Sequence, residues 1–534
     1  MPRTPFCRLP WSLAAMLAVG AAGCSSYDTG AFDPSGGYDD DWDGEGGTST
    51  TGDADEPAAG EDTGQDDGGA DPGGGELPPE PDDDGVDNGS EPTEQCDADH
   101  DVARMLLPDD SSSMSSPVQV REAVLGESGD VQGVGIRTWE FFNYYDFGYA
   151  AAQTDPVAVS PALLELADEP GEYLLQVGVS SQALTDDARA PMDLTLVLDT
   201  SSSMAGEPME LLVDSSRAIA ASLRAGDTIS IVTWSSDDAV ILAGHEVSGP
   251  DDAELVETID ALQPGGGIDL HAGLVAGYEL ARAAFDASRT NRVVLISDGT
   301  ANAGIADVEL IAEQAGGPSE HGIYTVGVGV GDPLSYHDDL MDVVTDVGKG
   351  ASVFVPTIDE AWKVLHDDFT STMAVAARDV RLRLDLPPGF ELVSTRLDGG
   401  LYAGQQQEQP QDLAPNDAMV FHQRIRTCAP QMLTEDTMVT VTVLYRDAQT
   451  FEERELPLAL PLAQMLQAEP APLLKGAAVF AYAESLKAYK NAELDAKLQT
   501  MDGAFAAIER AEAAAPGDPE LAEIRAVLEA LAQR

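Results

Sequence analysis

Carboxylate and hydroxyl side chains alternate along the segment Asp199-Thr200-Ser201-Ser202-Ser203. A tight loop with this spacing can direct three oxygen atoms towards one point, and oxygen atoms are the ligands that hard cations such as Mg²⁺ and Ca²⁺ prefer. A second carboxylate, Asp298, lies in the later segment Ser297-Asp298-Gly299. Both segments follow apolar runs typical of buried strands, so we expect them to meet at one rim of a sheet. The sequence therefore predicts a metal site built from two loops.

The elements that must position these loops alternate between strands and helices from residue 192 to about residue 372. Continuous apolar runs are typical of strands buried on both faces of a parallel sheet, and apolar residues at helical spacing lie between them. The runs cover residues 194–198, 228–234, 292–297 and 323–328, and the helical patterns cover residues 208–223, 252–262 and 270–285. This order predicts a Rossmann-like, doubly wound α/β sheet whose ligand site lies at the carboxyl ends of its central strands.

The two loops resemble the metal-ion-dependent adhesion site (MIDAS) of the von Willebrand factor type A (VWA) family. That site uses D-x-S-x-S, a Thr from a middle loop and an Asp in a later D-G turn. The resemblance assigns four of these five positions to Asp199, Ser201, Ser203 and Asp298. It implies Mg²⁺, or else Mn²⁺ or Ca²⁺, as the cofactor, and it implies no catalytic residue.

The fifth position of the resemblance differs in this chain. The middle loop reads Gly266-Gly267-Ile268-Asp269-Leu270, so Ile268 stands where the family has Thr, and Ile offers no oxygen ligand. A water molecule or the neighbouring Asp269 could substitute for the missing hydroxyl. His271 follows, and we expect it to pack against the loop or hydrogen-bond to it without binding the metal.

A wider resemblance covers most of residues 102–534. Residues 137–145, residues 298–304 and a C-terminal part that is first β-rich and then helical are similar to the bacterial VWA lipoproteins of the YfbK type. This resemblance implies a cell-envelope protein without established catalysis.

Composition and periodicity divide the chain into six parts. Strict alternation of apolar and polar residues predicts a β-rich, sandwich-like unit after the VWA domain, and Ala-rich amphipathic patterns predict a helical C-terminal segment. The expected parts are a lipoprotein signal peptide (1–23), an acidic disordered linker (24–95), an N-terminal family-specific region (96–190), the VWA domain (191–375), the β-rich domain (376–465) and the C-terminal helical region (466–534).

The N-terminus indicates export. Basic residues precede an apolar run, and small residues then lead to Cys24, which is the layout of a secretory signal. The sequence Ala21-Ala22-Gly23-Cys24 resembles a lipobox, which implies lipidation of Cys24; the alternative is an ordinary signal peptide cut nearby. Ser25 lacks the Asp that retains many lipoproteins in the inner membrane. We therefore expect a lipid anchor in the outer membrane of a Gram-negative cell envelope, on its periplasmic or surface face.

Acidic residues dominate the chain, whose formal net charge is −67. Such a charge repels phosphate backbones, so nucleic acid is excluded as a partner, and membrane contact is expected through the lipid anchor only. Residues 25–95 hold 23 Asp or Glu and no Lys or Arg, a composition that predicts disorder. Beyond the signal peptide and Cys24, the remaining cysteines are Cys96 and Cys428, an even pair that makes a disulfide our hypothesis for an oxidising compartment.

The leading hypothesis is a non-enzymatic cell-envelope lipoprotein whose VWA domain mediates divalent-cation-dependent protein–protein interaction or adhesion. In this hypothesis an unknown protein ligand offers an acidic residue to the cation at the MIDAS-like site. The alternative is a structural envelope scaffold with a degenerate, metal-free MIDAS, and Ile268 is the residue that favours it. An enzyme comes third, because no general base or nucleophile accompanies Asp199 and Asp298.

Overall fold

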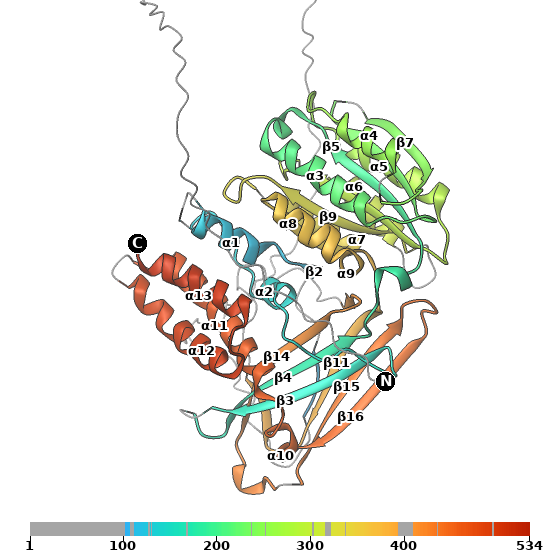
Figure 1. Ribbon diagram of the computed structural model, residues 1–534. Helices are drawn as coiled ribbons and strands as arrows, with labels where there is room; N and C mark the ends of the chain where they lie inside the picture. Colours follow the sequence, from blue (N-terminus) through green and yellow to red (C-terminus); the bar gives the residue numbers. More distant parts are fainter. Residues whose placement is uncertain are drawn as a thin grey trace, which may run out of the picture. The chain divides into compact units, whose positions relative to one another are not determined.

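A computed structural model describes residues 102–534 of the protein, apart from gaps at 107–111, 127–128, 130, 167–168, 237, 251, 302–303, 316–321, 337, 394–409, 435 and 494–495 (Figure 1). The chain divides into two units, residues 1–89 and 90–534, and every described residue belongs to the second. The signal peptide, Cys24, the acidic linker and Cys96 lie outside the described residues, so what the sequence predicts for them stays a prediction.

One sheet of seven strands carries both predicted metal loops. Its strand order is β2-β10-β9-β8-β5-β6-β7, and all neighbours are parallel except β6 and β7. The strands are β2 (Ser112–Ser113), β5 (Met192–Asp199), β6 (Thr228–Trp234), β7 (Asp238–Glu246), β8 (Thr290–Ser297), β9 (Tyr324–Val330) and β10 (Lys349–Val355). Strand β5 pairs with β6 on one side and β8 on the other, and all its residues are buried. The doubly wound α/β sheet is confirmed.

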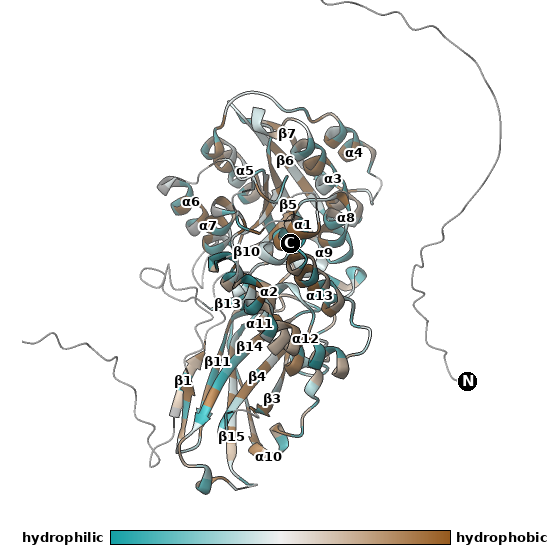
Figure 2. Ribbon diagram, turned by 90° about the vertical axis from the view of Figure 1, so that its left-hand side faces the viewer, coloured by the Kyte–Doolittle hydropathy of each residue, from teal (hydrophilic) through white to brown (hydrophobic). Residues whose placement is uncertain are grey.

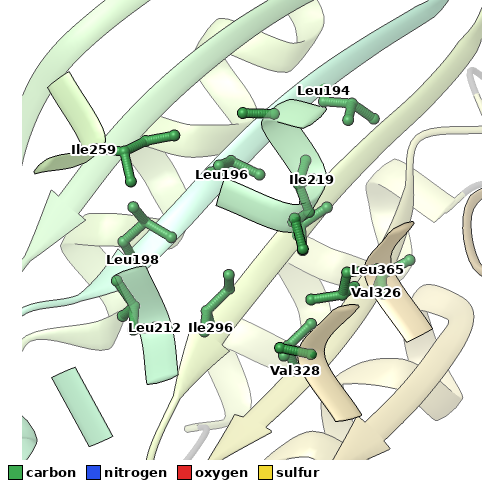
Figure 3. Packing of buried hydrophobic residues seen from close by; sticks show 14 of the residues in the cluster. Leu194, Leu196, Leu198, Leu212, Ile219, Ile259, Ile296, Val326, Val328 and Leu365 are labelled. Atoms are coloured by element: carbon green, nitrogen blue, oxygen red, sulfur yellow. The ribbon is translucent and has the colours of Figure 1, made fainter. Parts of the chain in front are cut away.

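Helices cover both faces of this sheet (Figure 1). Side chains on a strand alternate between faces. Leu194, Leu196 and Leu198 enter one core (Figure 3), whereas Val197 enters the other. The first core includes α3 (Glu207–Ser222), α4 (Ala253–Asp260), α8 (Ile358–Trp362) and α9 (Phe369–Met373), and the second includes α5 (Leu270–Ala284), α6 (Ile305–Ala315) and α7 (Asp339–Gly348). Burial of one such Leu contributes about 1.5–3 kcal/mol, and these cores hold the ends of β5 and β8 in place.

Two further sheets share a single core, which confirms the sandwich-like unit (Figure 2). One has the order β1-β11-β15-β16, with β13 also paired to β11, and the other has the order β12-β14-β4-β3. Their strands are β1 (Val102–Leu106), β3 (Val157–Glu165), β4 (Glu172–Ser181), β11 (Ala377–Leu386), β12 (Phe390–Val393), β13 (Gln411–Leu413), β14 (Ala418–Thr427), β15 (Met438–Asp447) and β16 (Glu453–Pro461). Strands before and after the VWA domain thus build this unit together.

Cys428 follows β14 and is disulfide-bonded. The hypothesis pairs it with Cys96, which lies outside the described residues, so this particular pairing stays a prediction.

The helical C-terminus packs with two helices from the N-terminal region. These elements are α1 (Ser115–Leu125), α2 (Thr138–Tyr144), α11 (Pro470–Asn491), α12 (Asp502–Ala514) and α13 (Pro519–Ala532), whereas the short α10 (Leu462–Met465) packs into the core of the sandwich. Aromatic residues of α2 enter the shared core, where Phe141 meets Tyr482 of α11 edge to face, with ring centres 5.3 Å apart. None of the helices in the described part of the chain has the length and apolar character needed to cross a membrane.

Candidate metal centre

Strand β5 ends at Asp199, and the chain then turns into η2 (Ser202–Met204), a single turn of 3-10 helix. The Asp199 carboxylate is fully buried. Its Oδ1 accepts the backbone N–H of Ser201 at 2.9 Å, and its Oδ2 accepts the hydroxyl of Ser297, the last residue of β8, at 2.7 Å. These two bonds fix the carboxylate between the ends of adjacent strands.

Electrostatics at Asp199 favour a nearby positive charge. Burial raises the pKa of this carboxyl group, the hydrogen bonds from Ser297 and Ser201 lower it, and the neighbouring Asp298 raises it again. Two carboxylates held close to each other in a partly buried site repel, and a bound cation would relieve that repulsion.

Three hydroxyl groups form a row between the two loops. Ser201 Oγ lies 2.9 Å from Ser203 Oγ, and Ser203 Oγ lies 3.1 Å from Thr300 Oγ1. The row ends at Asp298, whose Oδ1 accepts both the hydroxyl and the backbone N–H of Thr300, at 2.8 and 3.0 Å. The structure therefore brings Asp199, Ser201, Ser203 and Asp298 together at one edge of the sheet, and it adds Thr300.

The spacing of this row fits a small octahedral cation. Mg²⁺ binds oxygen at about 2.0–2.1 Å, which places adjacent corners of an octahedron about 3 Å apart. The two hydroxyl–hydroxyl distances, 2.9 and 3.1 Å, match that separation. Nowhere in the described part of the chain do three His, Cys, Asp or Glu side chains gather to hold a metal ion. A cation at this edge would thus depend on the hydroxyls as much as on the two carboxylates.

A tight turn after β8 positions the third loop, which comprises residues 297–300. Gly299 has a φ of +78°, a left-handed conformation that other residues adopt only with strain. Its N–H donates to Ser297 Oγ at 3.2 Å, so the same serine hydroxyl joins this turn to Asp199. The turn allows Asp298 and Thr300 to face the first loop together.

The middle loop contacts the first loop through its backbone. Gly265 N–H donates to the carbonyl of Thr200 at 2.7 Å, and the Ser202 hydroxyl donates to the carbonyl of Gly266 at 2.6 Å. Gly267 N–H donates to Ser236 Oγ at 2.6 Å. All three predicted loops therefore meet, but these contacts bring no side-chain oxygen of the middle loop to the row.

Side chains of the middle loop have other positions. Ile268 is 54% exposed, and Asp269, considered as its substitute, accepts the N–H of Ala272 at 3.0 Å and caps α5. The imidazole of His271 lies 2.6 Å from the buried carboxylate of Asp307 in α6, which also accepts the N–H of Gly304. His271 therefore links the start of α5 to the segment that follows the third loop.

Thr300 is the residue that the sequence reasoning missed. The MIDAS motif ends at the D-G pair, and the Thr300 hydroxyl lies one position further along the chain, in Asp298-Gly299-Thr300. The signal available in the sequence is a hydroxyl residue directly after a glycine turn, in a site whose expected Thr is replaced by Ile268.

Comparison with known proteins identifies the type of domain. Residues 194–300, from β5 to the third loop, match the von Willebrand factor type A domain family. The uncharacterized protein YfbK of Escherichia coli K12 is 28% identical over 264 residues, which cover 48% of this chain and 45% of YfbK. An uncharacterized protein of Synechocystis is 23% identical over 218 residues, covering 41% of this chain and 50% of that protein. The chain spans about half the length of the curated relatives that it matches.

Two solved structures are similar to this chain at low sequence identity. A von Willebrand factor type A protein from Catenulispora acidiphila is 13% identical with a TM-score of 0.44, covering 68% of this chain and 90% of that one. An ArnB paralog from Sulfolobus acidocaldarius is 15% identical with a TM-score of 0.39, covering 71% of this chain and 98% of that one.

Proposed function

This chain is a bacterial VWA protein of the YfbK type, and from that premise we propose that it is a non-enzymatic cell-envelope protein that binds a protein partner through a divalent cation. A VWA domain suggests protein–protein interaction or adhesion in general terms. The row of hydroxyls between Asp199 and Asp298 is the observation that carries the more specific proposal. Ser201, Ser203 and Thr300 would hold the cation, with the two carboxylates beside them.

Neutral ligands make this site suited to capturing an acidic side chain. When bound, Mg²⁺ or Mn²⁺ supplies a positive centre that an incoming carboxylate can complete. The three hydroxyls contribute no charge, and Asp199 and Asp298 together balance the divalent charge, so an incoming carboxylate would fill an open coordination position of the cation. The formal net charge of −67 otherwise repels an acidic partner, and the cation offsets that repulsion at the point of contact.

An enzymatic role is less well supported by the residues around the row. A hydrolytic site needs a nucleophile or general base within hydrogen-bond reach of the reacting group. His271, which follows the middle loop, bonds to Asp307 and makes no hydrogen bond to the row of hydroxyls in the described part of the chain. We therefore propose binding as the activity.

A scaffold without a metal is the second candidate, and one observation favours it. Ile268 occupies the position at which the family has a ligand, and its exposed side chain provides no oxygen. In this alternative the sandwich and the C-terminal helices make the contacts with other envelope components. The two candidates differ in whether binding requires the cation.

We also propose that the protein is anchored in the outer membrane through a lipid on Cys24. The support is the run of small residues before Cys24, and Ser25 after it. Growth with a radiolabelled or clickable fatty acid is expected to label the wild-type chain and to leave Cys24→Ser unlabelled. Equal labelling of both chains would contradict lipidation at this cysteine.

Removal of the Thr300 hydroxyl is expected to weaken Mg²⁺ binding. Thr300→Val keeps the shape of the side chain but removes one oxygen of the row, and loss of even an outer-shell group at a metal site typically costs about 10–100-fold in affinity. Calorimetric titration of the full chain with Mg²⁺ measures the change. Thr258→Val, whose hydroxyl donates only to the carbonyl of Glu254, is the matched control and should bind as wild type does. Unchanged affinity in Thr300→Val would remove Thr300 from the site.

Partner capture tests the proposed function itself. Cross-linked envelopes are purified through a tagged wild-type chain, with and without EDTA, and the retained proteins are compared with those retained by Asp199→Ala. We expect a set of proteins that disappears both with EDTA and in the variant, and that persists in Asp436→Ala, a change at an exposed carboxylate. Capture that survives both treatments would favour the scaffold.

A further inference from the structure

A second candidate site lies near the amino-terminal ends of the VWA strands, whereas the metal centre lies at their carboxyl ends. It is a cavity of about 580 Å³, within the range of small-molecule sites. The lining includes Lys349, the first residue of β10, and Arg292, near the start of β8, whereas the metal loops follow the last residues of their strands. Segments around α2, η3 (the π-helical segment Lys363–Asp367), β13 and β14 complete the walls, and α2, β10 and β13 are seen together in Figure 2.

Three carboxylates of this lining have no ion-pair partner in the described part of the chain. Asp146 follows α2, Asp368 lies between η3 and α9, and Asp417 precedes β14. Each is exposed to solvent. Asp146 and Asp417 accept only local backbone N–H groups, from Gly148 and Ala418, both at 2.7 Å. The lining therefore presents three acceptors that local structure leaves largely unused.

The three carboxylates lie close enough to affect one another electrostatically. Burial, together with the neighbouring charges of Asp146 and Asp368, raises the pKa of Asp417 to about 6. Burial likewise raises the pKa of Asp368, against the lowering effect of Lys363.

Two more carboxylates in the lining have buried oxygens without a hydrogen-bond donor. The side chain of Glu360 is 5% exposed, and that of Asp412 is 10% exposed. Glu360 Oε1 and Asp412 Oδ2 accept no hydrogen bond, although a cation lies 4.0 and 3.7 Å from them, respectively. Unsatisfied buried acceptors carry a free-energy cost that a ligand with N–H donors would reduce.

The cations of the lining already have partners. Arg292 lies over the ring of Tyr324 and donates to the carbonyl of Asn291 at 2.9 Å. Lys349 Nζ lies 3.7 Å from Asp379, and Lys363 Nζ donates to the hydroxyl of Tyr144 at 2.8 Å. The lining holds six carboxylates and three cations, so its net charge is negative and favours a cationic ligand.

Tyr144, Phe147 and Tyr149 also line the cavity, and Lys363 Nζ already lies 4.3 Å from the centre of the Tyr144 ring. Aromatic faces attract ammonium groups and pack well against methylene chains. We propose that this cavity binds an aliphatic polyamine, with ammonium groups paired to Asp146, Asp368 and Asp417 and the methylene chain against the rings. The proposal does not depend on the metal site.

Spermidine is the probe that tests this site. Calorimetric titration of the full chain at about 150 mM salt, where screening weakens contacts with exposed carboxylates, is expected to show one saturable site. Asp368→Asn/Asp417→Asn should lower its affinity at least tenfold, because two of the three charges are lost while the side-chain shapes remain. Asp359→Asn/Asp436→Asn, at exposed carboxylates that do not line the cavity, removes the same charge and should bind as wild type does.

Other results of this titration would overturn the spermidine site or its ligand class. Equal weakening in both double variants, or no saturable site in wild type, would overturn the proposal in favour of non-specific attraction to an acidic chain. Tighter binding of suberate, a dicarboxylate of similar length, or of a trilysine peptide would overturn the ligand class. Asp199→Ala is expected to bind spermidine normally, so failure of the metal site and failure of this site are distinguishable. Thermal unfolding of each variant checks that it folds.

Discussion

Asp199→Ala is expected to abolish saturable binding of Mg²⁺ and Mn²⁺ to the full chain. The substitution removes a carboxylate that is fully buried and that joins the first loop to Ser297 through two hydrogen bonds. The metal site then loses one negative charge, and the first loop loses the hydrogen bonds that hold its hydroxyls in position. Calorimetric titration should show one saturable site in wild type and only weak, non-saturating heat in the variant.

The acidic stretch at residues 25–95 makes a control necessary. Its 23 carboxylates attract divalent cations weakly in both proteins, so only the difference between the titrations reports on the site. Asp436→Ala removes one exposed carboxylate elsewhere and should leave the saturable site intact. Identical affinity and stoichiometry in wild type and Asp199→Ala would show that the cation binds somewhere else.

The largest effect on stability is expected at Asp227, the residue before β6. Its two carboxylate oxygens accept both Nη atoms of Arg189, at 3.0 and 2.6 Å, and the two side chains are 0 and 1% exposed. The same oxygens accept the N–H groups of Met192 and Arg224. Asp227→Ala leaves a buried guanidinium without its partner, and we expect the free energy of unfolding to fall by about 3–5 kcal/mol. Chemical denaturation at pH 7 measures this loss.

An exposed ion pair supplies the comparison for Asp227. Asp260 pairs with Arg217 at 2.8 Å, but these side chains are 47 and 43% exposed, so Asp260→Ala should cost less than about 1 kcal/mol. A similar cost for the two substitutions would contradict the assignment of Asp227 as a buried anchor.

Acid should reduce the contribution of Asp227. Burial alone would raise the pKa of this carboxyl group, but hydrogen bonds from Arg189, Arg224 and Met192 lower it below its ordinary value. A lowered pKa in the folded state stabilises the protein above the unfolded pKa of about 3.9, and this contribution is lost as the pH falls further. The difference in stability between wild type and Asp227→Ala should therefore narrow below about pH 4. A constant difference from pH 7 to pH 3 would contradict this linkage.

The sheet was predictable because its strands are buried on both faces. Continuous apolar runs such as residues 194–198 leave few alternatives, and the first and third loops follow from where such runs end. Helix α3 begins at Glu207, one residue before the expected start, because Pro208 suits a first turn. Local sequence patterns therefore predict the sheet that positions the metal site.

Long-range pairing was not predictable in the same way. Strand β4 pairs with β14 across more than two hundred residues, and α2 packs on α11 across an even greater separation. Alternation shows that each segment is a strand or helix, but it does not name the partner, which depends on how distant apolar faces fit together. The cavity lined by Asp146 and Asp417 arises from these pairings, so no local motif could indicate it.

Thr300 shows which part of the metal site the motif spacing does not predict. Its identity is plain in the sequence, but the direction of its hydroxyl depends on the left-handed turn at Gly299 and on contacts with Asp298 and Ser203. Motif spacing assigns ligands by position along the chain, whereas coordination depends on where oxygens lie in space.

Anomalous diffraction from crystals of the full chain grown with Mn²⁺ would locate the cation. We expect an anomalous peak about 2.1 Å from the hydroxyl oxygens of Ser201, Ser203 and Thr300, with Asp199 and Asp298 beside it. A peak that lies elsewhere, or density at this edge with no anomalous signal at saturating Mn²⁺, would contradict this expectation.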